Sequence, residues 1–354
     1  MTTDTDVSTV RDPVAIWTDG RLGRSGTKTA NNLLLLGTRW KVACVVDAVA
    51  AGADAGVILG VGALDVPVVP DLASAARAGA RSVVVGVNAM DADSHVPPRL
   101  RAFVVEAIAE GLDVVCATHA HLNDDPELKA RAASAGVRLV DVRTEGPRHT
   151  WSPGLRVDAT VVLTVGTDSA VGKMTTALLL HRAALAAGLS SGFVATGQIG
   201  NMCGADEVVH ADHTFGDFII GAVQRAVHRL AVQGRQIIVV EGQGAILHRA
   251  YGGGIINILF GAAPDAIIMC HHTDRVDRAM FPGLKVSSVA DELAVIEDLS
   301  RRVGISARLA GFSIFGSRPC DEAARYGVPV VNVRDQGSSD ILLRSVLDVT
   351  ASGR

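Results

Sequence analysis

Short apolar runs alternate with stretches of helical periodicity through the first part of the chain. The apolar runs are rich in Val, Ile and Ala, which is typical of strands buried on both faces of a parallel sheet. We expect these strands at Val14–Trp17, Val42–Val46, Val66–Val69, Arg81–Val87, Asp113–Ala117 and Val137–Val142. Helices are expected between them at Thr27–Leu36, Leu72–Ala78, Arg99–Glu110 and Pro126–Ala135. This alternation predicts a parallel sheet with helices on both faces.

The alternation stops at residues 144–157 and then resumes. The segment from Thr144 to Gly154 holds two prolines and two glycines without periodicity, which is typical of a domain boundary. We therefore place one domain at residues 1–148 and another at residues 149–354, as the length of the chain suggests. Strands of the second domain are expected at Ala159–Val165, Gly192–Ala195, Gln236–Val240, Ala266–Cys270, Ala307–Ser313 and Val328–Val331. Its helices are expected at Ala177–Leu185, Phe215–Val232, Ser288–Arg302, Asp321–Tyr326 and Ser338–Val346.

A loop with a Gly-Lys pair joins the expected strand Ala159–Val165 to the helix Ala177–Leu185. This is the layout of a P-loop, in which backbone N–H groups and a helix N-terminus wrap a phosphate. Lys173 adds a full positive charge against the same anion. We expect the phosphates of a nucleotide or nucleotide-bearing cofactor to be bound by Gly166, Thr167, Asp168, Ser169, Ala170, Val171, Gly172, Lys173, Met174 and Thr175. The fold class that follows is α/β, a Rossmann-like domain followed by a P-loop NTPase-like domain.

The loop departs from the usual P-loop pattern at two points. Five residues instead of four separate Gly166 from Gly172. Met174 stands where a Ser or Thr usually holds Mg²⁺, and a hydroxyl comes one residue later at Thr175. A phosphate cradle survives both changes, whereas phosphoryl transfer assisted by magnesium is less well supported.

Two further segments are expected near the loop, at the carboxyl ends of neighbouring strands. Glu241 follows the buried strand Gln236–Val240, where nucleotide-binding folds of this class place an acid beside the phosphates. If Mg²⁺ is used, Thr175 and Glu241 are the expected ligands; otherwise Glu241 is a loop-capping carboxylate or a catalytic base. Gly197 permits close backbone approach, and Gln198 offers both a donor and an acceptor to the cofactor.

The composition limits the classes of partner. The net charge of −4 and the absence of a basic block argue against a nucleic-acid surface. Five dispersed cysteines without a Cys-x-x-Cys pair support neither a zinc site nor a disulfide framework. No apolar run is long and clean enough to span a bilayer, so we expect a cytoplasmic protein without a membrane partner. The apolar fraction of 48% makes a homo-oligomer plausible.

Two other candidate sites are weaker. Asp47 ends the second expected strand, where a dinucleotide-binding domain has its ribose-binding acid, but the glycines at 20, 23 and 26 lack the Gly-x-Gly-x-x-Gly spacing. NAD binding is therefore disfavoured. His271 and His272 are adjacent on a strand and point to opposite faces, which argues against a shared metal ion.

Three sequence motifs together resemble the D-glutamate N-acetyltransferase family, long catalogued as a domain of unknown function. They are the loop from Gly166 to Thr176, the Ala195–Gly200 segment and the Val240–Ala245 segment. The Lys-Met-Thr variant belongs to the same pattern, and the resemblance covers most of the chain. It implies a Rossmann-like N-terminal domain, a P-loop C-terminal domain and acetyl-CoA as cofactor. The P-loop half also resembles dethiobiotin synthetase, an ATP- and magnesium-dependent ligase.

The resemblance implies an acyl-CoA-dependent N-acyltransferase that acts on a small amino acid, with D-glutamate as the acceptor of at least one branch. Glu241 or His248 would accept the proton of the attacking amine. An acidic acceptor needs cations and polar groups, for which the candidates are Arg143, Arg148, Arg249 and His119. The His248–Tyr251 segment departs from the pattern expected of the family, so the acceptor stays open. The alternative is a ligase or kinase that uses ATP with Mg²⁺, and a non-catalytic nucleotide sensor is the third class.

Overall fold

The computed structural model describes residues 6–24, 26–87, 96–155 and 157–351. Contacts divide the chain into two compact units, one of residues 1–144 with 202–204 and one of residues 145–201 with 205–354. Each unit has its own sheet and its own hydrophobic core. Within the described ranges, no helix has the length and the apolar character needed to cross a membrane.

The first unit is built on a six-stranded sheet in the order β3-β2-β1-β4-β5-β6. Every pair of neighbouring strands is parallel. The strands are β1 (Val14–Trp17), β2 (Val42–Val46), β3 (Val68–Val69), β4 (Ser82–Val85), β5 (Asp113–Cys116) and β6 (Leu139–Asp141). The order reverses between β1 and β4, which is the arrangement of a Rossmann domain. The prediction of a Rossmann-like first domain is confirmed.

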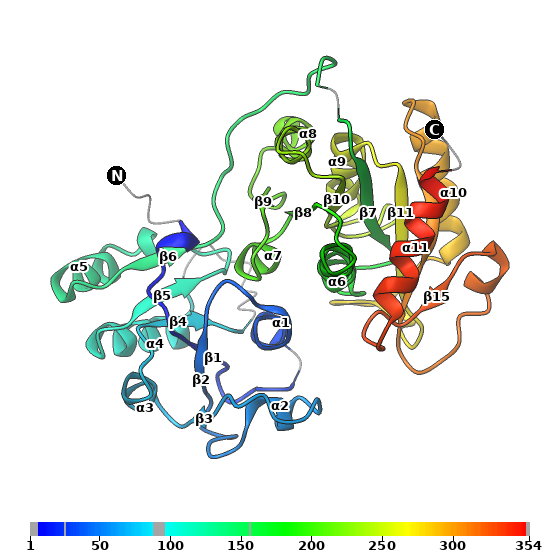
Figure 1. The fold of residues 1–354 in the computed structure, drawn as a ribbon. Helices are drawn as coiled ribbons and strands as arrows, with labels where there is room; N and C mark the ends of the chain where they lie inside the picture. Colours follow the sequence, from blue (N-terminus) through cyan, green and yellow to red (C-terminus); the bar gives the residue numbers. More distant parts are fainter. Residues whose placement is uncertain (1–5, 25, 88–95, 156, 352–354) are drawn as a thin grey trace. The chain divides into compact units, whose positions relative to one another are not determined.

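Helices cover both faces of this sheet (Figure 1). They are α1 (Lys28–Leu36), α2 (Ala55–Ile58), α3 (Leu72–Arg77), α4 (Pro98–Ala109) and α5 (Pro126–Ala135). On one face the ring of Trp17 stacks on Phe103 of α4, with centroids 4.0 Å apart. Ile16 points the opposite way because side chains alternate along a strand. There a side chain at Gly86 would collide with both Ile16 and Ala30 of α1, so the glycine permits this close packing.

The Asp47 carboxylate is fully engaged by its own chain. Its Oδ2 accepts hydrogen bonds from the Thr18 hydroxyl (2.7 Å) and the Leu22 N–H (2.9 Å). Its Oδ1 accepts from the N–H groups of Val49 and Ala50, both at 3.0 Å. Although burial favours the neutral acid, these bonds lower the pKa of Asp47. Asp47 therefore organises the loops after β1 and β2, and its oxygens are already committed to donors of the protein.

The second unit is built on a seven-stranded sheet in the order β15-β14-β11-β7-β10-β8-β9. All its neighbouring strands are parallel. The strands are β7 (Thr160–Gly166), β8 (Ser191–Ala195), β9 (Glu207–Val208), β10 (Ile237–Val240), β11 (Ala266–His272), β14 (Arg308–Phe315) and β15 (Val330–Val331). β7 lies between β10 and β11, and the strand order reverses there. Ligands of open α/β sheets bind at the carboxyl ends of strands beside such a switch point.

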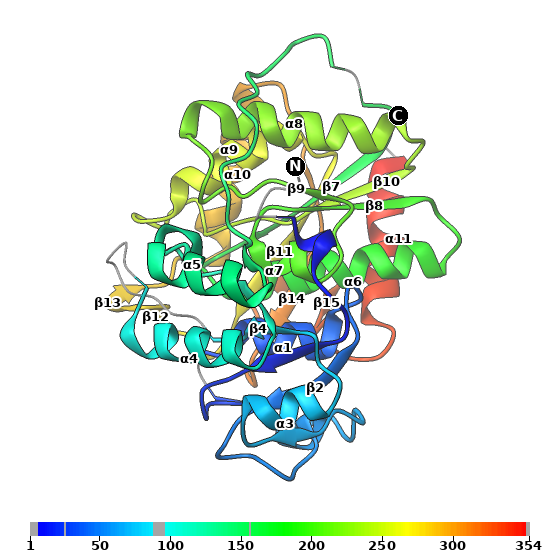
Figure 2. The same ribbon diagram turned by 90° about the vertical axis from the view of Figure 1, so that its left-hand side faces the viewer.

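Two layers of helices enclose the sheet of the second unit (Figures 1 and 2). α6 (Lys173–Ala186) and α11 (Ser338–Ala351) lie on one face. α8 (Gly216–Val232), α9 (Gly252–Ala262) and α10 (Val289–Arg302) lie on the other. The remaining elements are the short helix α7 (Gln198–Met202) and the hairpin of β12 (Asp277–Arg278) and β13 (Phe281–Lys285). A P-loop NTPase-like second domain is confirmed by this architecture.

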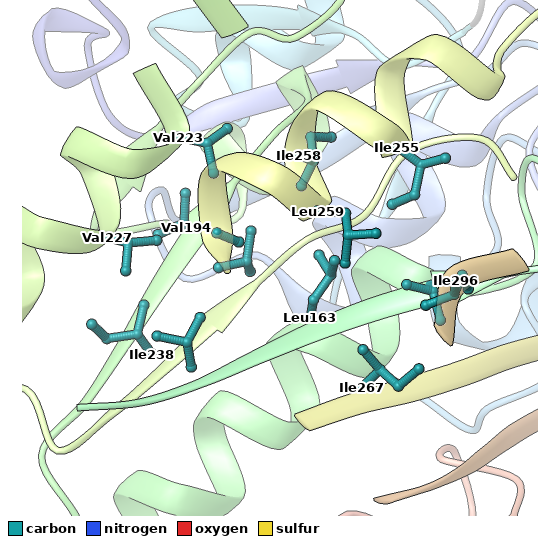
Figure 3. Packing of buried hydrophobic residues seen from close by; sticks show 14 of the residues in the cluster. Leu163, Val194, Val223, Val227, Ile238, Ile255, Ile258, Leu259, Ile267 and Ile296 are labelled. Carbon is teal, nitrogen blue, oxygen red and sulfur yellow. The ribbon is translucent and has the colours of Figure 1, made fainter. Parts of the chain in front are cut away.

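Aliphatic side chains fill the space between the sheet and the α8–α9–α10 layer, as Figure 3 shows. Leu163 of β7 lies beneath Leu259 of α9, and Val194 and Ile238 extend the same layer towards α8. Each of these four side chains is fully buried. Burying a Leu or Ile side chain contributes about 1.5–3 kcal/mol to folding. This packing fixes β7, and with it the residues that follow its carboxyl end.

Candidate functional site

The loop between β7 and α6 has a backbone that requires glycine. Gly172 is the N-cap of α6 and has φ +97°, and Ala170 also lies in the left-handed region with φ +52°. A Cβ atom on Gly172 would come within 2.0 Å of the Phe315 ring at the end of β14. The glycine therefore serves both the turn and the close approach of a neighbouring strand end.

The N–H groups of this loop are available to an anion. Among the described residues, no carbonyl accepts a hydrogen bond from the N–H of Ser169, Ala170 or Gly172. The first N–H groups of α6 have no intrahelical acceptor either, because a helix always leaves its first turn unpaired. Alternating left- and right-handed residues with free N–H groups form an anion-binding concavity. The loop thus fits a phosphate.

Lys173 extends back across this loop. Its side chain is 6% exposed, and its Nζ donates to the carbonyl of Asp168 at 2.7 Å. Its positive charge therefore lies beside the loop N–H groups, where it would add to the attraction of an anionic ligand. The geometry is that expected of a P-loop lysine.

Thr175 and Thr176 are separated by the structure into two environments. The Thr176 hydroxyl donates to the Ser313 hydroxyl at 2.8 Å and belongs to the packing of α6 on β14. Thr175 lies in the first turn of α6 and is also buried. Thr175 remains the hydroxyl predicted as a magnesium ligand, because it lies in the first turn of the helix that follows the loop.

Glu241 follows β10, which pairs directly with β7. Its Oε2 accepts from the Thr196 N–H (3.1 Å) and its Oε1 from the Gln243 amide (3.2 Å). A Cβ on Gly200 would lie 2.9 Å from Oε2, so this glycine makes room for the carboxylate. Glu241 is 5% exposed at the same sheet edge as the loop. One carboxylate and one hydroxyl are ligands suited to Mg²⁺, and a buried carboxylate can also act as a base.

Gly197 and Gln198 lie on the next strand end along this edge. Gly197 follows β8, and a Cβ there would lie 3.1 Å from the Gln243 amide nitrogen. Gln198 begins α7. Both residues therefore border the Glu241 side of the site, whereas the Lys173 side is bordered by β11 and β14.

Two arginines that the sequence analysis did not single out brace the loop. Arg275 donates from Nη1 to Oδ2 of Asp168 (3.0 Å) and to the Ser169 carbonyl, and from Nη2 to the Ala170 carbonyl (3.2 Å). Arg278 donates to the carbonyls of Thr167 (3.1 Å) and Leu247 (3.0 Å). The arginines thus bind the carbonyl oxygens of three loop residues, Thr167, Ser169 and Ala170. The loop is held from outside in the form that presents its N–H groups to a ligand.

His271 and His272 are the last two residues of β11. His271 Nδ1 lies 2.8 Å from the Thr167 hydroxyl and ties the start of the loop to β11. Asp274 follows the two histidines in the sequence, and its carboxylate accepts a hydrogen bond from the Ser317 N–H (2.7 Å). The pKa values of both histidines are lowered, chiefly because the side chains are shielded from water.

His248 lies against the same network. It is 1% exposed, and its ring contacts those of Tyr251 and Phe281, with centroids 4.7 and 5.3 Å away. Its Nδ1 accepts from the Ala250 N–H at 3.1 Å, and its Nε2 lies 3.6 Å from Oδ1 of Asp168. Burial and then the charge of Arg278 keep the pKa of His248 below its usual value.

The comparisons with known proteins agree with this architecture. Residues 48–145 match the Rossmann-like domain, and residues 143–342 the P-loop domain, of a family described as a domain of unknown function, DUF1611. The chain belongs to the DUF1611 family. A crystal structure of a DUF1611 family protein from Anabaena variabilis superimposes with a TM-score of 0.84 at 27% identity, covering 96% of this chain and 100% of that one.

Two curated relatives of this DUF1611 chain are named D-glutamate N-acetyltransferase. The protein from Tritonibacter scottomollicae is 30% identical over 280 residues, covering 77% of this chain and 83% of the relative. The protein from a Pseudoalteromonas species is 29% identical over 281 residues with the same coverage. These matches confirm the resemblance drawn from the P-loop motifs.

The predicted acceptor-binding residues of the DUF1611 chain lie in different surroundings. Arg249 is exposed on the segment that follows Glu241. Arg148 is exposed, pairs with Glu145 at 2.8 Å and lies over the Phe215 ring. In the first unit, Arg143 is buried and donates to the Ala117 carbonyl at 2.7 Å, and burial lowers its pKa to about 10. His119 is exposed at the end of the β5 region of that unit.

Replacing Arg275 with alanine is expected to weaken binding of inorganic pyrophosphate, as a probe for the loop, about tenfold. Hydrogen bonds to charged groups contribute about 1.5–3 kcal/mol, and part of that energy holds the loop in its binding form. Lysine at this position should restore little, because a single ammonium cannot span the Asp168 carboxylate and two carbonyls. Isothermal calorimetry measures the effect. Arg302, which pairs with Asp298 on the exposed face of α10, is the matched control; equal affinities of the two alanine variants would contradict the bracing role.

Proposed function

We propose that this protein is an acetyl-CoA-dependent N-acyltransferase that acts on the amino group of a small amino acid, with D-glutamate as the leading acceptor. The match to two relatives named D-glutamate N-acetyltransferase, over 77% of the chain, carries the proposal. The P-loop supports it because coenzyme A contains a diphosphate and a 3′-phosphate. Binding of those phosphates to the loop is part of the proposal.

The composition of the loop suits a cofactor that is held and not cleaved at its phosphates. Gly172, Lys173 and the loop N–H groups can bind an anion without a metal ion. Met174 removes the hydroxyl that ordinarily coordinates Mg²⁺ next to the lysine. The loss of this magnesium ligand has little effect on function when no phosphoryl group is transferred. The loop therefore favours a carrier role for the bound nucleotide.

The reaction consists of attack by the amine nitrogen on the thioester carbonyl. The ammonium of the acceptor first gives up one proton and becomes the attacking amine. The new C–N bond then forms and the C–S bond breaks. The nitrogen loses a second proton, which goes to the leaving thiolate, so that coenzyme A departs as the thiol. Glu241 is the proposed proton acceptor because it is a buried carboxylate at the strand end next to β7. N–H groups of the glycine-containing strand ends can stabilise the oxyanion.

The test is an assay of free thiol release from acetyl-CoA with D-glutamate, L-glutamate and other small amino acids. Turnover that requires D-glutamate, with N-acetylglutamate identified by mass spectrometry, is the expected result. If acetyl-CoA does not bind in calorimetry while ATP with Mg²⁺ binds well, the acyltransferase proposal is lost.

The second candidate is a ligase or kinase that uses ATP with Mg²⁺. One observation favours it. Glu241 follows the carboxyl end of β10, and Thr175 lies in the first turn of α6, which follows the neighbouring strand β7. A carboxylate and a hydroxyl are ligands suited to the metal. Mg²⁺ bound there would neutralise phosphate charge. Release of ADP or AMP that depends on a small-molecule partner would establish this function in place of the first.

A further inference from the structure

Asp168 is the residue at which the loop, the β11–β12 connection and the segment after Glu241 converge. Its carboxylate is completely buried. Oδ2 is saturated, because it accepts from Arg275 (3.0 Å) and from the Ala279 N–H (2.8 Å). The carbonyl of the same residue accepts from Lys173 Nζ. A displacement of Asp168 therefore moves the group that positions the phosphate-binding lysine.

The second carboxylate oxygen faces His248. Oδ1 of Asp168 and Nε2 of His248 are 3.6 Å apart, beyond a hydrogen bond, and neither has a hydrogen-bond partner among the described residues. Nη1 of Arg278 lies 4.0 Å from Oδ1. Two buried polar atoms that lack partners and face each other gain by a small approach, since an unpaired buried polar group is costly. The pair is thus poised to close.

The protonation of His248 follows from its other nitrogen. Because the Ala250 N–H donates to Nδ1, that nitrogen carries the lone pair, and the proton of the neutral ring lies on Nε2. Nε2–H therefore points its hydrogen at a carboxylate. In this arrangement neither nitrogen is free to take a proton from a substrate.

We propose that His248 is a positioning residue: its Nε2–H binds Oδ1 of Asp168 when an anion occupies the loop, and so holds Lys173 and the loop against that anion. It is not the base of the reaction. The inference deepens the proposed function and rests on it only for the choice of coenzyme A as ligand. The structural argument itself requires an anion at the loop and nothing more.

Two substitutions separate positioning from base catalysis. His248→Phe keeps a ring beside Tyr251 and Phe281 but removes the donor, whereas His248→Gln offers an amide N–H in place of Nε2–H. We expect the Kd of coenzyme A to rise about tenfold in H248F, which loses one hydrogen bond. In H248Q the amide partly restores that bond, so the Kd should rise only about threefold. In both variants kcat with acetyl-CoA should fall less than about fivefold, and its pH profile should keep its acidic limb.

The matched control is His228→Gln. His228 lies near the C-terminal end of α8, which covers the face of the sheet opposite to α6, so this variant should bind and turn over like the parent. If H248Q loses about a hundredfold or more in kcat at unchanged Kd, His248 is the base and the proposal is overturned. An unchanged Kd in H248F overturns it as well. Should H248F fail to fold, the kcat of H248Q alone decides between the two roles.

Inorganic pyrophosphate keeps this test separate from the proposed function. If the parent protein binds pyrophosphate but not coenzyme A, the acyltransferase function fails, while the same order of Kd values for pyrophosphate still supports positioning. Equal Kd values for pyrophosphate in parent and H248F overturn positioning. If the parent binds neither probe, both proposals fail.

Discussion

Replacing Lys173 with alanine is expected to weaken coenzyme A binding about a hundredfold and to leave the fold intact. The ammonium group contributes charge-assisted hydrogen bonds to phosphate, each of about 1.5–3 kcal/mol, in a loop that is shielded from water. In the protein Lys173 is 6% exposed and bonds the carbonyl of Asp168. Removing the side chain removes this hydrogen bond and a buried charge. Calorimetry of coenzyme A binding and the thermal unfolding midpoint check the two parts of the prediction.

Lys129 on the exposed surface of α5 provides the matched control for Lys173. Its alanine variant loses the same charge and the same methylene groups, but far along the chain and in the other unit. An equal, small effect in both variants would show that the loop does not bind the phosphates. A Lys173 variant that fails to fold would instead assign the lysine a structural role.

Replacing Glu241 with glutamine is expected to lower kcat about a hundredfold while coenzyme A binding changes little. A positioned general base contributes about 10²–10⁴ to the rate, and an amide cannot accept the proton of the amine. Glutamine has nearly the same shape as glutamate, and its amide oxygen can still accept from the Thr196 N–H, so we expect the fold to tolerate the change. Steady-state kinetics with acetyl-CoA and calorimetry with coenzyme A separate the two effects.

Glu297 on the exposed face of α10 is the control for the same substitution. If Glu241→Gln abolishes magnesium-dependent binding of ATP and leaves acetyl transfer untouched, Glu241 is a metal ligand and the ligase alternative gains the support. If Glu241→Gln changes neither kcat nor the binding of ATP, the Glu241 carboxylate only caps the N–H groups of its loop.

The strand, loop and helix around Lys173 were predictable from the sequence because every local signal agreed there. The apolar run became β7, the Gly-Lys pair became the start of α6, and the acid after the next apolar run lies at the end of β10. Periodicity and glycine placement are properties of neighbouring residues, so they can be recognised in the sequence without knowledge of the fold.

Helix α9 was not predicted, because it is stabilised by packing against other elements and not by its local sequence. It begins with Gly252, Gly253 and Gly254, residues of low helix propensity that indicate a loop. Its stability comes from Ile255, Ile258 and Leu259, which pack between α8 and β7. Burial of that apolar face outweighs the glycines, and the sequence alone does not show which surface receives it.

The arginine brace was also missed, because its contacts join distant parts of the chain. Arg275 is 107 residues from Asp168, and Arg278 is 111 residues from Thr167. The two arginines reach the loop only because the sheet places β11 beside β7. The sequence signal, two arginines directly after a strand, acquires meaning once the strand order is known.

The contact of Phe315 with Gly172 determines how late in synthesis the loop can reach its folded form. The loop is made early in synthesis, but its far wall is supplied by a strand end more than a hundred residues later. Contacts of such long sequence separation form slowly, because the intervening chain must be ordered first. A chain that ends before Phe315 would carry the whole Gly-Lys motif without this contact, so we expect the loop to bind an anion only after the second unit has folded completely.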